Sequence, residues 1–221
     1  MKKVNLRTEF FLWLVMLVPF VYLWLSWQEL PARVPIHFNL QGEADGWADK
    51  SILIGLLLFI TVGLYLLLLL LPKIDPKRKI EHTSPVYARI RVVLVLFMAA
   101  LGVYSIYSAS GQQAVNLNLI LISIGVLVAA LGNYLQSLKP NYFIGIRTPW
   151  TLESETVWRK THRLSGPIWF AGGLLIALLA LVDDSMVRQV LLIAIIAILV
   201  LVPVTYSYME SKKEKKLNSQ A

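Results

Sequence analysis

The amino-acid sequence predicts an all-α integral membrane protein, a bundle of six transmembrane helices with an interfacial amphipathic helix on its cytoplasmic side. Of its 221 residues 57% are hydrophobic and 15% are charged, and the mean hydropathy is +0.65. A soluble domain of this length cannot bury so many apolar residues. The apolar residues also gather in long runs, each near the roughly 20 residues that cross a hydrocarbon core. Both observations predict membrane helices.

The apolar runs define the expected helices, at residues 10–27, 51–71, 92–108, 117–138, 168–182 and 187–208. The first run resembles the apolar core of a signal peptide, but it is long and no small-residue cleavage motif follows it. We therefore expect an uncleaved helix with a kink at Pro19. The expected units are residues 1–72 with the loop 28–50, residues 86–208 with the loop 139–166, and the basic tail 209–221.

Lys and Arg residues alternate between the connections of these helices. Both termini, the second loop and the fourth loop hold 18 of them, and the other three loops hold 3. Positively charged segments stay in the cytoplasm, so both termini and residues 139–166 are expected inside and residues 28–50 outside. The same distribution accounts for the net charge of +8 without nucleic-acid binding. The absence of cysteine leaves the redox compartment open.

The segment between the fourth and fifth helices is polar and rich in aromatic residues. Gly145 and Pro149 predict a shaped loop, and Thr151 stands where a helix N-cap is expected. From Leu152 to Leu164 the pattern is helical and amphipathic, with basic residues on one side. We expect this helix to lie in the membrane interface, with Trp158 at headgroup depth.

The predicted outer loop combines turn residues with several polar side chains. Its two prolines favour extended backbone, residues 36–39 suit a short strand, and Gly42 and Gly46 allow turns. Four titratable side chains, those of His37, Glu43, Asp45 and Asp49, are possible metal ligands. Their spacing has no helical period, so a metal site and simple turn-stabilising or solvated carboxylates are both open, and we expect no metal.

The sequence offers few candidates for catalysis. The titratable side chains on the inner side are those of Glu81, His82, Glu153, Glu155 and His162. Two residues apart on a helix, Glu153 and Glu155 point in nearly opposite directions, and Glu155 lies about 10 Å along the axis from His162. Glu155 is instead one turn before Arg159, a favourable pair. The motifs of metalloproteases, serine hydrolases and P-loop enzymes are absent, so we expect no enzyme.

Ion-coupled transport is the other alternative, and it normally places ionisable residues inside membrane helices. We expect none in the six helix cores, because Arg89 and Arg91 precede the third apolar run. Small residues repeat at four-residue spacing at Gly125 and Ala129 and again at Gly173 and Ala177. That spacing predicts close packing of helices.

Two segments resemble the SdpI family of bacterial membrane proteins. The string IGIRTPWTLESETVWRKTHR is similar to the family's hallmark, and LPARVPIHFNLQGEADGWADK is similar to the domain of unknown function that often precedes it. The hallmark falls on Asn141, Gly145, Arg147, Thr148, Pro149, Trp150, Thr151, Leu152, Glu155, Val157 and Trp158.

The resemblance implies a protein of the bacterial cell membrane that gives immunity to a secreted peptide toxin. It also implies that a cytoplasmic transcriptional repressor can be captured at the inner face, without direct contact to nucleic acid. Membrane lipids are the remaining expected partner, and no cofactor is expected. A membrane-embedded hydrolase and a peptide exporter remain the alternatives. The expected binding residues are Asn141, Gly145, Arg147, Thr148, Pro149, Trp150, Thr151, Glu155 and Trp158 inside, and His37, Asn39, Gly42 and Asp45 outside.

Overall fold

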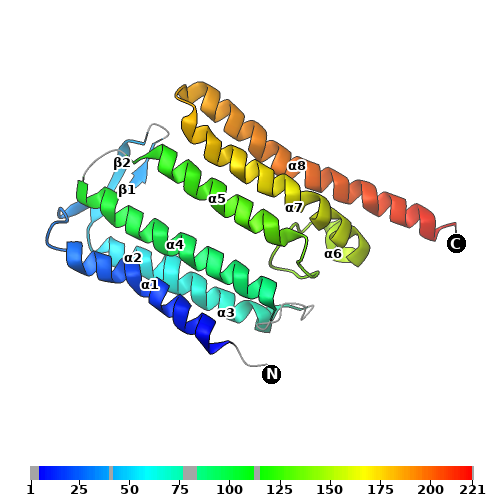
Figure 1. The fold of residues 1–221 in the computed structure, drawn as a ribbon, viewed down its shortest axis with the longest axis horizontal. Helices are drawn as coiled ribbons and strands as arrows, with labels where there is room; N and C mark the ends of the chain where they lie inside the picture. The colour runs from blue at the N-terminus through cyan, green and yellow to red at the C-terminus, as the bar shows by residue number, and fades with distance from the viewer. Residues whose placement is uncertain (1–4, 40–41, 77–83, 112–114, 221) are drawn as a thin grey trace. The chain divides into compact units, whose positions relative to one another are not determined.

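The structure, a computed structural model, describes residues 5–39, 42–76, 84–111 and 115–220. Within these ranges six helices are long and apolar enough to cross a membrane (Figure 1). The predicted fold class, a predominantly helical multi-pass membrane protein, is therefore confirmed. The chain divides into two compact units, residues 1–70 with 91–117, and residues 71–90 with 118–221.

The first unit, called unit 1, consists of three apolar helices and a β-hairpin. Its elements are α1 (Leu6–Ser26), β1 (Arg33–Phe38), β2 (Ala44–Asp49), α2 (Ile52–Leu57), the π-helical turn η1 (Leu58–Gly63), the first part of α3 (Leu64–Ile74) and most of α4 (Pro85–Gly111). The Asn5 side chain caps α1 by accepting a hydrogen bond from the Arg7 amide. The elements α2, η1 and α3 continue one another as a single membrane-spanning segment.

The outer loop of the prediction is a two-stranded antiparallel hairpin, in which Arg33 pairs with Asp49 and Val34 with Ala48. The expected short strand at 36–39 overlaps β1 over residues 36–38, and a second strand pairs with it. Gly42 has a φ of 83°, a left-handed conformation that favours glycine, and so the turn forms where the sequence predicts it.

The hairpin end of unit 1 is held by an apolar core. Buried side chains from α1, the hairpin, α2 and α4 form this outer core: Leu23, Leu30, Val34, Leu53, Leu57, Ile106 and Ala109. Val34 is completely buried, so the core anchors the hairpin to the helices through one strand residue. Removing apolar surface from water in this way is favourable through the hydrophobic effect.

The second unit, called unit 2, contains the remaining helices. Its elements are the end of α3, the start of α4, α5 (Leu117–Leu135), α6 (Pro149–Glu153), α7 (Glu155–Leu178), the 3-10 turn η2 (Leu179–Leu181) and α8 (Ser185–Asn218). Helices α7 and α8 run antiparallel along each other (Figure 1). Asp184 caps α8 by accepting a hydrogen bond from the Val187 amide, and the Trp169 indole donates to the Leu199 carbonyl across the pair.

Small residues bring α5 and α7 into backbone contact. A side chain at Gly125 would collide with the backbone of Gly173 and Ala177, and one at Gly173 would collide with Ala129. The two small-residue repeats noted in the sequence therefore face each other, which is how helices without large side chains between them gain dispersion energy in lipid.

The structure differs from the sequence prediction at α7. We expected a separate interfacial helix over Leu152–Leu164, but α7 runs unbroken from Glu155 through Ser165–Pro167 to Leu178. Pro167 is accommodated inside the helix, and the Ser165 hydroxyl donates to the Thr161 carbonyl one turn earlier. The amphipathic pattern reflects packing within the protein on one side of α7, because Val157, Trp158 and Thr161 are buried there.

Candidate functional site

The loop before α6 is built around the side chain of Asn141, which is 2% exposed. Its Oδ1 accepts hydrogen bonds from the amides of Phe143 and Ile144 at 2.8 and 2.7 Å. Its Nδ2 donates to the carbonyls of Lys139 and Ile144 at 2.9 and 3.1 Å. Asn side chains favour such local turns because they imitate backbone groups. One side chain therefore fixes the conformation of the whole loop.

His162 joins this loop to α7. The Ile146 amide donates to His162 Nε2 at 3.0 Å, and Nδ1 lies 2.9 Å from the Trp158 carbonyl. A carbonyl can only accept, so Nδ1 carries the proton and the ring is neutral with both nitrogens engaged. Gly145 lies against the ring with a φ of 109°, where a side chain would collide with Nε2. Glycine is required there by conformation and by space.

Trp158 lies beside His162 in the same buried layer. Their rings stack with centroids 4.0 Å apart, and the indole Nε1 donates to the Leu138 carbonyl at 2.8 Å. The expectation that Trp158 anchors the chain at headgroup depth is wrong, because the side chain is fully buried. It closes the loop against α7, since its only polar atom satisfies a carbonyl just after the end of α5.

The segment Thr148–Thr151 starts α6. The N-cap is Thr148, not Thr151 as expected: the Thr148 hydroxyl accepts from the Thr151 amide, and the Thr151 hydroxyl accepts in return from the Thr148 amide at 2.9 Å. Pro149 occupies the first turn, where its missing amide proton costs no hydrogen bond. The Thr148 hydroxyl also donates to Ser207 Oγ on α8 at 3.0 Å. The cap thereby ties α6 to α8.

Trp150 and Arg147 lie on the more accessible side of this segment. The Trp150 ring packs against Tyr208 of α8, with centroids 5.0 Å apart. Arg147 is exposed, and its guanidinium donates to the Tyr142 carbonyl of its own loop at 2.6 Å. The remaining donors of the guanidinium are therefore presented at the surface beside an aromatic pair.

A second link connects the start of α7 to the charged end of α8. Ser154 caps α7 and its hydroxyl donates to Glu214 at 2.9 Å. Lys160 and Lys213 both pair with the buried Glu210, at 2.7 and 2.9 Å. Ser207, Glu210 and Glu214 were not among the residues predicted to have a role. Two carboxylates within a lysine-rich tail were the signal that could have indicated partners on α7.

The hairpin brings the outer candidate residues together. His37 Nδ1 lies 2.5 Å from Asp45 Oδ1 across the strands, and Asn39 exchanges hydrogen bonds with Glu43 around the turn. Gly42 donates its amide to the Asn39 carbonyl and accepts from the Val115 amide. These side chains therefore stabilise the hairpin and its turn, and the His37 and Asp45 side chains remain largely accessible.

The described residues contain no group of three or more His, Cys, Asp or Glu side chains that could hold a metal ion. Of the catalytic candidates, Glu81 and His82 lie outside the described residues. The buried ring of His162 has both nitrogens in hydrogen bonds, so it has no free position from which to transfer a proton. The arrangement around α6 and α7 is suited to holding a shape.

Helices α1 and α4 begin before the apolar runs that the sequence predicts at 10–27 and 92–108, and they take in two ionisable residues that precede these runs. Helix α1 begins at Leu6 and α4 at Pro85, so Glu9 and Arg91 both lie inside membrane-spanning helices. They form a buried ion pair, with side chains 7% and 1% exposed. Apolar runs in the sequence could not reveal it, because charged residues at the end of a run can extend the helix when they neutralise each other.

Comparison with known proteins identifies two regions of this chain. Residues 137–207 match the SdpI/YfhL protein family, and residues 14–63 match a domain of unknown function, DUF1648. The chain is also 32% identical over 88 residues to the protein named Immunity protein SdpI of Bacillus subtilis strain 168. That alignment covers 39% of this chain and 42% of the relative, so it spans less than half of either protein. No solved structure matches the chain.

Proposed function

We propose that this multi-pass membrane protein protects a bacterium from a secreted peptide toxin by binding at the membrane. The proposal rests on the match of residues 137–207 to the SdpI/YfhL family and of residues 14–63 to the DUF1648 domain. The similarity to a protein named as an immunity protein supports this function. The binding mechanism is supported by the hydrogen bonds of three residues in the motif segment. Asn141, His162 and Thr148 use their polar atoms to hold a loop in one shape, and none is left to perform chemistry.

The proposed orientation places the hairpin outside the cell and the motif loop inside. The asymmetry of Lys and Arg between alternate connections supports it. In this orientation a toxin approaching from outside first meets the hairpin, whose accessible side chains include Ile36 and Trp47, 50% and 42% exposed, and also His37 and Asp45. Exposed aromatic and aliphatic side chains next to a few charges suit an apolar peptide.

On the cytoplasmic side the proposed partner surface lies around Arg147 and Trp150. A guanidinium whose position is fixed by one carbonyl can bind a carboxylate through its remaining donors. A transcriptional repressor that presents acidic residues would therefore find a rigid contact here. This finer role in signalling is a second proposal that rests on the exposed position of Arg147 next to the Trp150–Tyr208 pair.

The orientation is tested by single cysteines in this cysteine-free chain. An impermeant thiol reagent added to intact cells is expected to label Asp49→Cys on the hairpin and to spare Ser154→Cys at the start of α7. Both positions are expected to react after the cells are opened. Labelling of Ser154→Cys in intact cells without labelling of Asp49→Cys would reverse the proposed orientation.

The function is tested by expressing the chain in a toxin-sensitive bacterium and challenging it with secreted antimicrobial peptides. Binding predicts that protection rises with the amount of this protein and that the toxin recovered from the culture is intact by mass spectrometry. A hydrolase would instead produce cleaved toxin only when the protein is present. An exporter would lower the cell-associated toxin only while the cells are energised, so a proton-motive-force uncoupler separates it from a binding protein. No protection against any secreted peptide would contradict the proposed function itself.

A further inference from the structure

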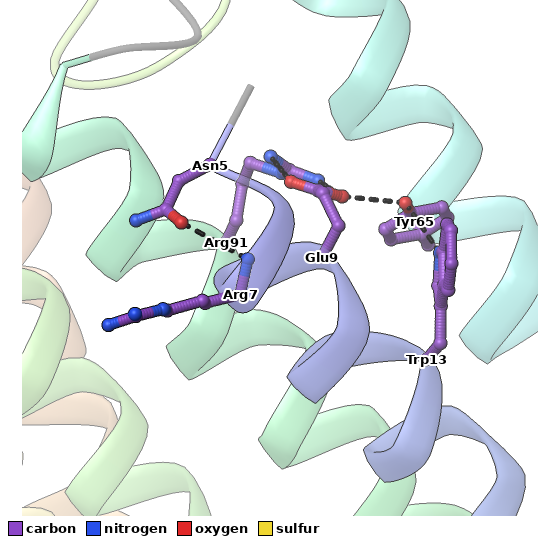
Figure 2. A network of polar contacts seen from close by, with 6 residues as sticks. All are labelled: Asn5, Arg7, Glu9, Trp13, Tyr65 and Arg91. Carbon is purple, nitrogen blue, oxygen red and sulfur yellow. Dashed lines mark hydrogen bonds and ion pairs between the residues drawn. The ribbon is translucent and has the colours of Figure 1, made fainter. Parts of the chain in front are cut away.

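We propose that Glu9 and Arg91 form a polar latch between α1 and α4 of unit 1, and that opening this latch lets α1 bend at Pro19. The latch consists of Glu9 and Arg91, of Tyr65, which donates to Glu9, and of Trp13, which donates to Tyr65 (Figure 2). The proposal concerns a movement within unit 1, and it holds or fails independently of the toxin proposed above.

The latch is a carboxylate receptor that is filled by a residue of the same chain. Arg91 binds Glu9 through two parallel hydrogen bonds of 2.7 and 2.8 Å, the geometry that gives Arg–carboxylate pairs their specificity. The Tyr65 hydroxyl donates to the same carboxylate at 2.6 Å and accepts from the Trp13 indole at 2.8 Å. Three helical segments, α1, α3 and α4, are thus joined by one carboxylate (Figure 2).

Static packing does not require such a cluster. A buried ion pair carries a large desolvation cost, and apolar residues of similar volume often hold helices together as well or better. The guanidinium is also incompletely satisfied, because Arg91 Nε is buried without a hydrogen-bond partner. Ionisable residues inside membrane segments are usually retained for function. The cluster is therefore better explained by a contact that has to break and re-form than by a permanent joint.

Between the latch and the hairpin, unit 1 has a deformable level, at which two of its spanning segments contain features that allow bending and α4 packs against them. Pro19 interrupts the hydrogen bonding of α1, and the π-helical turn η1 interrupts the second spanning segment. Gly102 of α4 lies against both: a side chain there would collide with Leu57, just before η1, and crowd Pro19. Prolines and π-helical turns are the usual causes of bends in helices, and π-helical turns are frequent at functional sites.

The two ends of unit 1 are held by different forces on either side of this level. The hairpin end is packed around the outer core, where Val34 and Leu57 are fully buried, and the other end is held by the latch. A bend of about 20° at Pro19, acting over the roughly 15 Å of helix between Pro19 and Glu9, displaces the latch end of α1 by about 5 Å. A ligand that binds unit 1 more tightly when α1 is bent than when it is straight would therefore shift the latch toward its open state.

The movement is measured with pairs of spin labels in the purified protein in lipid nanodiscs. Labels at Phe10→Cys and Leu96→Cys report the latch end, and labels at Trp24→Cys and Tyr107→Cys report the hairpin end; all of these positions are exposed on α1 or α4. Neutralising the carboxylate with Glu9→Gln is expected to lengthen and broaden the latch-end distance by about 5 Å, the bend estimated above. The hairpin-end distance is expected to stay unchanged.

The same substitution at an exposed carboxylate of unit 1, Glu29→Gln, serves as the matched control and is expected to change neither distance. The double variant Glu9→Met, Arg91→Met replaces the latch by an apolar contact and is expected to keep the latch-end distance short and narrow. It also shows whether the unit folds without the ion pair. An unchanged latch-end distance in Glu9→Gln, or equal broadening at both ends, would overturn the proposal.

Discussion

The latch of unit 1 and the motif loop of unit 2 are both buried polar networks, but they are built from opposite chemistry. The latch rests on two opposite charges and leaves the Arg91 Nε donor unsatisfied. The loop rests on neutral groups: both nitrogens of His162 and the whole amide of Asn141 are engaged. Neutral hydrogen-bonded groups hold one shape without a buried charge, whereas a buried ion pair is sensitive to any change in its surroundings. The loop therefore acts as a scaffold, and the latch is the contact that we expect to move.

The largest effect is expected when one partner of the ion pair in the latch is replaced. Arg91→Met removes the guanidinium that pairs with the buried Glu9 carboxylate, and we expect a loss of about 3–5 kcal/mol in the free energy of unfolding. Adding Glu9→Met to the same chain is expected to recover most of that loss, because the apolar pair carries no desolvation cost. Denaturant or thermal unfolding in detergent measures both. Recovery of stability in the double variant would distinguish the latch from the motif loop. Equal stability of the single and double variants would show that the buried ion pair is not what makes the latch sensitive.

In the loop, His162→Phe keeps the ring stacked on Trp158 but removes both nitrogens. The Ile146 amide then lacks its acceptor in a partly buried site, and we expect a loss of about 1–3 kcal/mol in the free energy of unfolding. Hydrogen–deuterium exchange is expected to show faster exchange at residues 141–148, with unit 1 unchanged. If the loop kept its protection in this variant, His162 would not be what joins it to α7.

Capping of α6 is expected to contribute less. Thr148→Val keeps the shape of the side chain but removes the hydroxyl that caps α6 and donates to Ser207, and we expect a loss of about 1 kcal/mol. Thr205→Val removes a hydroxyl on α8 that only bonds its own helix, and it is the matched control. Comparable melting temperatures for the two variants would show that the link between α6 and α8 carries no stability.

The smallest effect on stability is expected at Arg147. Because the side chain is exposed, Arg147→Lys is expected to change the free energy of unfolding by less than about 0.5 kcal/mol. It nevertheless loses the planar fork that can bind a carboxylate, so protection or signalling is expected to fall. Arg159→Lys, another exposed arginine of the same region, is the control. Wild-type protection and signalling in Arg147→Lys would exclude a structured binding role for Arg147.

The sequence by itself determined the membrane helices of this protein. Six apolar runs predicted the helices, since only a membrane accommodates so many apolar residues in runs of that length. Gly42 and Gly145 predicted turns, and in the structure these two residues have φ values of 83° and 109°. The repeats at Gly125 and Gly173 predicted close helix packing, because a missing side chain is a local property that any neighbour can use.

Only the tertiary structure decided which residues meet. Glu9 and Arg91 are separated by 82 positions, and Thr148 and Ser207 by 59. A helix surrounded by lipid is apolar on nearly all sides, so its hydrophobic pattern does not reveal which face turns toward a neighbour. Trp158 shows the consequence: its amphipathic surroundings predicted a membrane interface, and it lies fully buried. The rotation of each helix about its axis placed these side chains together, and that rotation is set by packing between helices.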